Sequence, residues 1–162
     1  MLTPVRAKSV WAGNASFAVV ASRYNGRYVE AMLRAARTEL KRSGAKQVEV
    51  FRVPGAYEIP VVAARLARTG SSHTPRFAAI ICLGVILRGE TVHAAHIGEA
   101  VSRALMELQL KYEVPVIHEV LLLENEQQAR ARCLSKTHNR GAEAAQTALA
   151  MAAVMERLDT SF

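Results

Sequence analysis

Short apolar runs of strand length alternate with longer helix-forming stretches along this chain. The runs cover residues 17–21, 47–53, 77–87 and 114–121, and the stretches 28–43, 60–69, 91–112, 125–134 and 142–158 are predicted to be helices. Strands that alternate with helices form a parallel sheet with helices on both faces. The sequence therefore predicts an α/β fold, a three-layer α/β/α sandwich around a central four-stranded parallel sheet. Residues 1–14 have no clean period and are expected to form an N-terminal arm or edge strand, and 70–76 a polar connector.

The loops that follow the four predicted strands are expected to lie together. Right-handed crossovers bring the carboxyl ends of parallel strands to one edge of the sheet. The loops at 22–26, 54–60, 88–93 and 121–125 would share that edge. In open α/β sheets, ligands bind in this crevice.

Length and composition limit the class of protein. With 162 residues, the chain is expected to form one domain, 1–162. It has no apolar run long enough for a membrane span and no signal-peptide pattern, so we expect a cytoplasmic protein without a membrane partner. The net charge of +7 comes from scattered basic residues without aromatic interleaving, which argues against nucleic-acid binding. Cys82 and Cys133 lie in predicted core elements and are interpreted as reduced thiols.

The stretch 84–93, Gly-Val-Ile-Leu-Arg-Gly-Glu-Thr-Val-His, is the strongest candidate site. It joins a buried strand to a helix, where Thr91 could cap the helix and free backbone N–H groups could bind an anion. The glycine spacing imitates a P-loop, but Glu90 stands in place of its lysine and would repel a triphosphate. A single bound phosphate stays possible, and His93 in the first helical turn is a candidate general acid or base.

A metal site is a weak interpretation. His93 and His96 are three residues apart on a predicted helix, but neither an HExxH motif nor a cysteine cluster accompanies them. No metal ligand is therefore predicted.

Four ordered motifs resemble the lumazine synthase family. Residues 22–25 read Ser-Arg-Tyr-Asn, residues 53–60 Val-Pro-Gly-Ala-Tyr-Glu-Ile-Pro, and residues 88–93 Arg-Gly-Glu-Thr-Val-His. The fourth motif runs from Val120 through Glu-Asn-Glu-Gln-Gln-Ala at 124–129 to Arg132, Lys136, Asn139 and Gly141. The resemblance is collinear from about residue 16 to 157. It implies a flavodoxin-like fold and the synthesis of 6,7-dimethyl-8-ribityllumazine, the penultimate step of riboflavin synthesis.

The resemblance also implies a reaction and its partners. The family condenses 5-amino-6-(D-ribitylamino)uracil with 3,4-dihydroxy-2-butanone 4-phosphate, by imine formation, phosphate elimination and ring closure. It uses no metal or organic cofactor. Its members are pentamers, and some assemble twelve pentamers into a 60-subunit shell, so a homo-oligomer is expected here.

Carried over by matching motif positions, the family site assigns roles to fourteen residues. Tyr24 would stack on the pyrimidine, His93 would transfer protons, and Lys136 would support the site electrostatically. Glu90, Thr91 and Arg132 would hold the phosphate, while Arg132 and His118 would come from a neighbouring subunit. The remaining expected pocket residues are Asn25, Ala56, Tyr57, Glu58, Val85, Ile86 and Leu87.

Several positions depart from the family pattern. Ala94 and Ala95 replace an aromatic residue and an acid, His118 stands where an aromatic residue is frequent, and Glu119 replaces a common glycine. Ala131 replaces a frequent glutamate, and the stretch 136–139 reads Lys-Thr-His-Asn. These departures leave an alternative open: a non-catalytic paralogue that binds flavin or lumazine, or that forms a shell.

Overall fold

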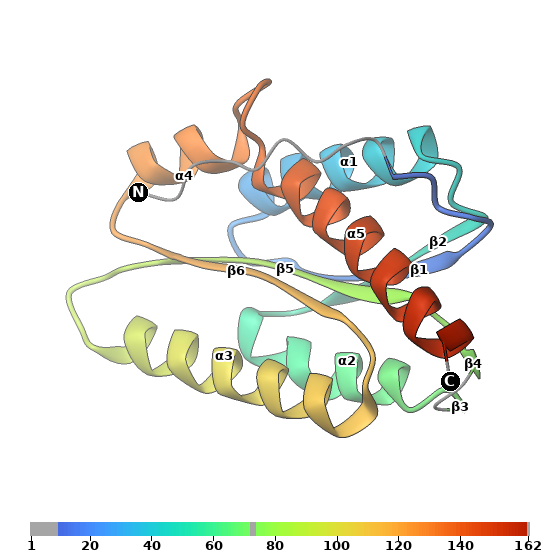
Figure 1. The fold of residues 1–162 in the computed structure, drawn as a ribbon. Helices are drawn as coiled ribbons and strands as arrows, with labels where there is room; N and C mark the ends of the chain where they lie inside the picture. Colours follow the sequence, from blue (N-terminus) through green and yellow to red (C-terminus); the bar gives the residue numbers. More distant parts are fainter. Residues whose placement is uncertain (1–9, 72–73, 162) are drawn as a thin grey trace.

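A parallel sheet forms the centre of the protein. The computed structural model describes residues 10–71 and 74–161. Within them, the central sheet contains β1 (Ser16–Ser22), β2 (Gln47–Val53), β5 (Ala79–Leu87) and β6 (Val116–Leu123). The strand order is β2-β1-β5-β6, and each neighbouring pair is parallel (Figure 1). The predicted four-stranded parallel sheet is confirmed.

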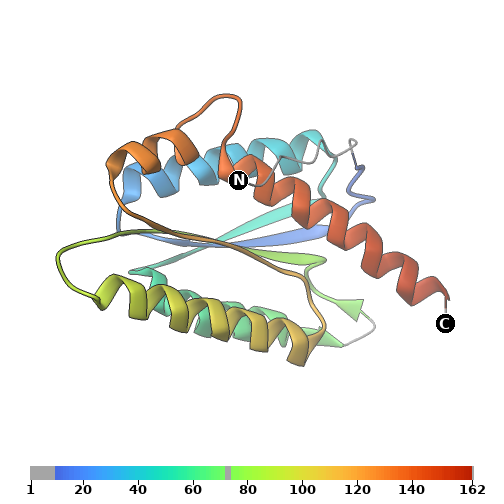
Figure 2. The same cartoon turned by 60° about the vertical axis from the view of Figure 1, so that its left-hand side comes forward.

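Helices cover both faces of this sheet. α1 (Gly26–Arg42), α4 (Glu126–Cys133) and α5 (Arg140–Ser161) lie on one face, and α2 (Ile59–Ala67) and α3 (His93–Tyr112) lie on the other (Figures 1 and 2). A short 3-10 helix, η1 (Ala56–Glu58), leads into α2. The three layers confirm the predicted α/β/α fold class, and none of the helices in the described ranges is apolar over enough of its length to cross a membrane.

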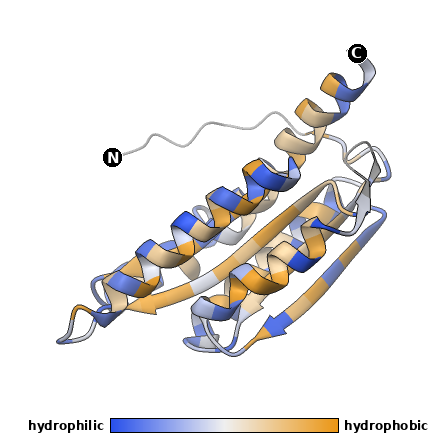
Figure 3. Ribbon diagram, turned by 90° about the horizontal axis from the view of Figure 1, so that it is seen from below, coloured by the Kyte–Doolittle hydropathy of each residue, from blue (hydrophilic) through white to orange (hydrophobic). Residues whose placement is uncertain are grey.

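The central strands are apolar because both of their faces are buried. Val19 and Ile81 point into the core under α1 and α5, whereas Val20 and Ile80 point into the core over α2 and α3. A strand covered on both faces has no polar side, so it becomes a nearly continuous apolar run. Figure 3 shows the resulting contrast between the mostly orange strands and the helices, which carry both blue and orange residues.

Three local expectations differ from the structure. The connector predicted at 70–76 contains two short antiparallel strands, β3 (Gly70–Ser71) and β4 (Thr74–Pro75). Val92, not Thr91, occupies the N-cap of α3. β6 extends to Leu123, past the predicted end, because Leu87 on β5 pairs with Leu123.

The predicted arm lies largely outside the described residues, which begin at position 10. The Trp11 side chain is 73% exposed, yet its ring lies directly over Gly44. A Cβ added at Gly44 would stand 2.4 Å from a carbon of that ring. The glycine that ends α1 therefore also accommodates Trp11.

Candidate active site

A cavity of about 670 Å³ opens at the carboxyl edge of the sheet. The loops after β1, β2 and β5 and the first turns of α3 form it, as the parallel topology requires. Its lining residues are Tyr24, Asn25, Gly55, Ala56, Tyr57, Glu58, Val85, Ile86, Leu87, His93, His96, Ile97 and Ala100. The sequence-based expectation that these loops share one edge is confirmed.

Hydrogen bonds hold the three loops against one another. The Asn25 side chain donates from Nδ2 to the carbonyl oxygen of Val85 at 2.7 Å, which joins the first loop to the end of β5. Asn25 has a positive φ of 53°, a conformation that asparagine tolerates better than most residues. The backbone N–H of Tyr24 donates to the carbonyl of Pro54 at 3.1 Å, which joins the first loop to the second.

Gly55 lets the Tyr24 ring pack on the second loop. A Cβ added at Gly55 would stand 3.1 Å from the Tyr24 ring and 2.9 Å from the Glu58 carboxylate. That carboxylate accepts a hydrogen bond from the Gly55 N–H at 2.8 Å. Tyr24 and Tyr57 are nevertheless 72% and 64% exposed. They present aromatic faces on which a flat heterocycle could stack.

Two imidazoles line the cavity from α3. His93 is the first residue of the helix. Its backbone N–H donates a long hydrogen bond, 3.4 Å, to the hydroxyl oxygen of Thr91, the residue predicted to be the N-cap. His96 follows one turn later and lines the same cavity. His96 was not assigned to the pocket from sequence, although its three-residue spacing from His93 is the signal that could have placed it there.

The loop between β5 and α3 is exposed. The Arg88 guanidinium forms an ion pair with Glu124 after β6, with 3.0 Å between Nη1 and Oε1, and so links two strand-end loops. Glu90 and Thr91 are exposed and do not line the cavity described above. Of the three residues expected to hold the phosphate, these two are close in sequence to the lining residue His93, whereas Arg132 is not.

Three expected site residues lie elsewhere on the subunit. His118 is on β6 and faces α3, where its Nε2 lies 2.8 Å from the Ser102 hydroxyl. Packing against α3 partly desolvates His118 and lowers the pKa of its imidazole. Arg132 on α4 and Lys136 in the following loop are exposed on the opposite side of the sheet. A single chain therefore does not bring these three residues to the cavity.

The cysteines behave as core residues. Cys82 and Cys133 are both free thiols and both buried, which confirms the sequence-based interpretation. Burial raises the pKa of Cys82 far above its usual value and raises that of Cys133 to about 11. Within the described ranges, no group of three histidine, cysteine or acidic side chains could hold a metal ion.

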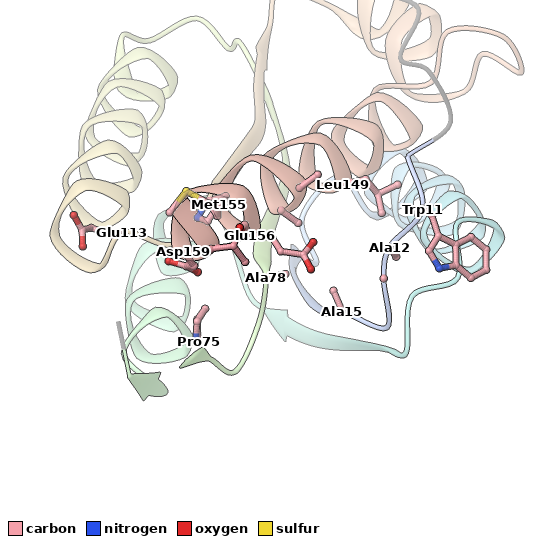
Figure 4. Close-up of a pocket in the computed structure, with 15 residues that line it drawn as sticks. Trp11, Ala12, Ala15, Pro75, Ala78, Glu113, Leu149, Met155, Glu156 and Asp159 are labelled. Carbon is pink, nitrogen blue, oxygen red and sulfur yellow. The ribbon is translucent and has the colours of Figure 1, made fainter. Parts of the chain in front are cut away.

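A second cavity, of about 250 Å³, lies at the other edge of the sheet (Figure 4). Ala15, Ala78 and Pro115 line it just before β1, β5 and β6, so it lies at the amino ends of the strands. Leu149 and Glu156 line it from α5. It shares no lining residue with the cavity near His93 and does not contribute to the candidate site.

The fold and the site together define a class of protein. It is a three-layer α/β protein with a cavity at the carboxyl edge of a parallel sheet, lined by two tyrosines and two histidines.

Comparison with known proteins narrows this class to one family. The family model of 6,7-dimethyl-8-ribityllumazine synthase matches residues 14–156. The 6,7-dimethyl-8-ribityllumazine synthase of Stenotrophomonas maltophilia (strain R551-3) is 40% identical over 147 residues, which cover 90% of this chain and 92% of the relative. That of Xanthomonas oryzae pv. oryzae (strain PXO99A) is 40% identical over 146 residues, 89% of this chain and 92% of the relative. The chain belongs to the 6,7-dimethyl-8-ribityllumazine synthase family and is a transferase, which confirms the resemblance seen in the four motifs.

Proposed function

We propose that this chain condenses 5-amino-6-(D-ribitylamino)uracil with 3,4-dihydroxy-2-butanone 4-phosphate. The products are 6,7-dimethyl-8-ribityllumazine, phosphate and water, and the reaction belongs to riboflavin biosynthesis. The observation that carries this proposal is the convergence of Tyr24, Tyr57 and His93 on one cavity, in a chain that matches the family over residues 14–156. The condensation changes no oxidation state overall, so it calls for no redox cofactor.

The cavity suits the pyrimidine substrate. A heterocyclic ring can stack on Tyr24, while Ala56, Tyr57 and Glu58 line the space for the ribityl chain. The backbone of residues 85–87 offers hydrogen-bonding groups at the end of β5, and Asn25 holds that backbone in place through its bond to Val85. Holding two substrates in a reactive orientation supplies much of the lowering of the barrier in a condensation.

The proton transfers fall to His93. Imine formation, phosphate elimination and ring closure each move a proton near neutral pH, and imidazole titrates in this range. His93 lines the cavity and directly follows the Glu90–Thr91 loop, where the phosphate of the butanone substrate would lie. An arginine completes a phosphomonoester site well, because its guanidinium binds two phosphate oxygens at once.

We propose that the phosphate arginine comes from a second copy of the chain. Arg132, Lys136 and His118 are all exposed, and none of them lines the cavity of their own subunit. A homo-oligomer, either a pentamer or a 60-subunit shell of pentamers, would bring them to the neighbouring cavity. Analytical ultracentrifugation distinguishes these two assemblies, and a monomer that is fully active would refute the shared site.

The direct test is turnover of both substrates by the purified protein without added metal. We expect a fluorescent lumazine product and release of inorganic phosphate in equal amounts. Tight riboflavin binding without any turnover would overturn the proposal and indicate a ligand-binding paralogue instead.

A further inference from the structure

Glu119 on β6 is a buried carboxylate that the reaction does not use. It is 6% exposed, and its position in the strand directs it towards α4 and α5. Desolvation disfavours the charged form of a carboxyl group. Burial accordingly raises the pKa of Glu119 to about 7, against the opposing effect of Arg140. Above neutral pH, Glu119 is therefore an anion that needs a cationic partner.

Arg140, the first residue of α5, supplies that partner. Its Nε lies 3.0 Å from Oε2 of Glu119, and its Nη2 lies 2.8 Å from Oε1, so the guanidinium binds both carboxylate oxygens. Its Nη1 also donates to Glu143 at 2.7 Å. Two-pronged pairs of this kind are the stronger and more directional form of arginine–carboxylate contact.

A second arginine lies within electrostatic reach of the same carboxylate. Among the charges around Glu119, Arg140 lowers its pKa most, Glu143 raises it, and Arg132 on α4 lowers it least. The neighbouring Cys133 thiol feels the Glu119 charge as well. Yet Arg132 is exposed and forms no ion pair within the described ranges.

The two arginines stand at opposite ends of one short kink. Asn139 closes this kink, because its side chain donates to the carbonyl of Cys133 and accepts from the N–H of Gly141. The kink thus presents Arg140 inward to Glu119 and leaves Arg132 at the surface. If Arg140 were removed, Glu119 would either take up a proton or attract the remaining guanidinium of Arg132.

We propose that Arg140 is a positioning residue that neutralises Glu119 and thereby keeps Arg132 available for the substrate phosphate. The proposal rests on the proposed function, in which Arg132 holds that phosphate. The Glu119 carboxylate then competes with the substrate phosphate for Arg132. Arg140 prevents this by pairing with Glu119 itself. Both residues act through Arg132 and not by touching the substrate.

The proposal predicts a reversal between single and double variants. It is measured at pH 9, because loss of Arg140 removes a charge that lowers the pKa of Glu119. In Arg140→Met, the KM for the butanone phosphate should rise about tenfold, a typical size for coupling between neighbouring charges. The KM for the pyrimidine substrate should stay within about twofold. Glu119→Gln alone should leave both KM values nearly unchanged. In the double variant, the KM for the butanone phosphate should return close to the wild-type value, because the competitor is gone.

Two further variants separate this role from a structural one. Glu143→Gln removes the other partner of Arg140 and should leave phosphate affinity unchanged. Arg140→Lys keeps the charge and should restore most of the affinity that Arg140→Met loses. The defect of Arg140→Met should also grow from pH 7 to pH 9. A protonated Glu119 does not attract Arg132, whereas an ionised Glu119 does. Circular dichroism and the oligomeric state are measured for every variant.

A binding assay keeps this test independent of turnover. Calorimetric titration with inorganic phosphate should show the same loss in Arg140→Met and the same recovery in the double variant. A double variant as defective as Arg140→Met, or equal losses for both substrates, overturns the proposal. A wild-type protein that binds phosphate but makes no lumazine overturns the proposed function instead, and the titration still decides the role of Arg140.

Discussion

The contact between α5 and α1 allows a sharp test of the packing. Gly141, in the first turn of α5, lies against the backbone of Met32 in α1. A Cβ added at Gly141 would stand 2.0 Å from the Met32 carbonyl oxygen and 2.6 Å from its Cα. These are backbone atoms in the middle of a helix, so no side-chain rotation can relieve the overlap. Gly141→Ala must therefore push α5 away from α1 or distort one of them.

The size of the effect follows from two opposing terms. Overpacking costs about 1–3 kcal/mol when side chains can adjust, and the backbone clash at Gly141 places it at the upper end. Replacing a helical glycine by alanine gains up to about 1 kcal/mol, and less in the first turn. We expect Gly141→Ala to lower the free energy of unfolding by at least about 2 kcal/mol. The midpoint of thermal unfolding should fall by about 6 °C.

Gly98 provides the matched control. It is also helical, on α3, but a Cβ added there would stand 3.6 Å from the Leu122 side chain, an ordinary contact. Gly98→Ala should be neutral or stabilising by up to about 1 kcal/mol. Urea unfolding followed by circular dichroism, at one fixed protein concentration, compares both variants with the wild type. A Gly141→Ala protein within about 0.5 kcal/mol of wild type would refute the close packing of α5 on α1.

Three other predictions concern the site and its surroundings. His93→Ala should lower kcat by about a hundredfold in steady-state kinetics, while a binding titration should show that a pyrimidine analogue still binds. Loss of this binding would contradict the proton-transfer role. Arg132→Ala should raise the KM for the butanone phosphate by about tenfold or more with little change for the pyrimidine; equal changes for both substrates would contradict its assignment. Burial raises the pKa of Glu119 from 4.5 to about 7, so the folded protein binds this proton more tightly than the unfolded chain does. The wild type should therefore lose about 3 kcal/mol of stability relative to Glu119→Gln as the pH rises from about 4.5 to above 7, and parallel stability curves from urea titrations would contradict this.

Much of the fold could be predicted because the signals are local. β5 is a continuous apolar run because both of its faces are buried, and α1 is an amphipathic stretch because one of its faces is buried. Both patterns can be recognised within a short window of the sequence. The boundaries were less predictable. Leu122 and Leu123 belong to β6 because they pair with the end of β5, and this pairing joins residues about 36 positions apart. The β3–β4 strands are two residues each, too short for any periodic pattern.

The site was predictable where it follows from motifs and strand ends. The loops that carry Tyr24, Tyr57 and His93 do meet at one cavity, because parallel strands present their carboxyl ends together. His96 was not predicted as a pocket residue, since spacing on a helix does not say which face points inward. Likewise, Glu119 stood out only as a departure from a glycine position, and its partner was not predictable.

The amino-acid sequence by itself determined the α/β class, the family and the edge of the sheet that carries the site. Each of these depends on local periodicity or on ordered motifs, and these are properties of the chain before it folds. The tertiary structure alone decided that Arg140 and not Arg132 binds Glu119, and that His118 faces Ser102 and not the cavity. The physical reason is that a charge or a ring takes the partner that packing brings within reach. Packing between β6, α3 and α5 joins residues far apart in the sequence.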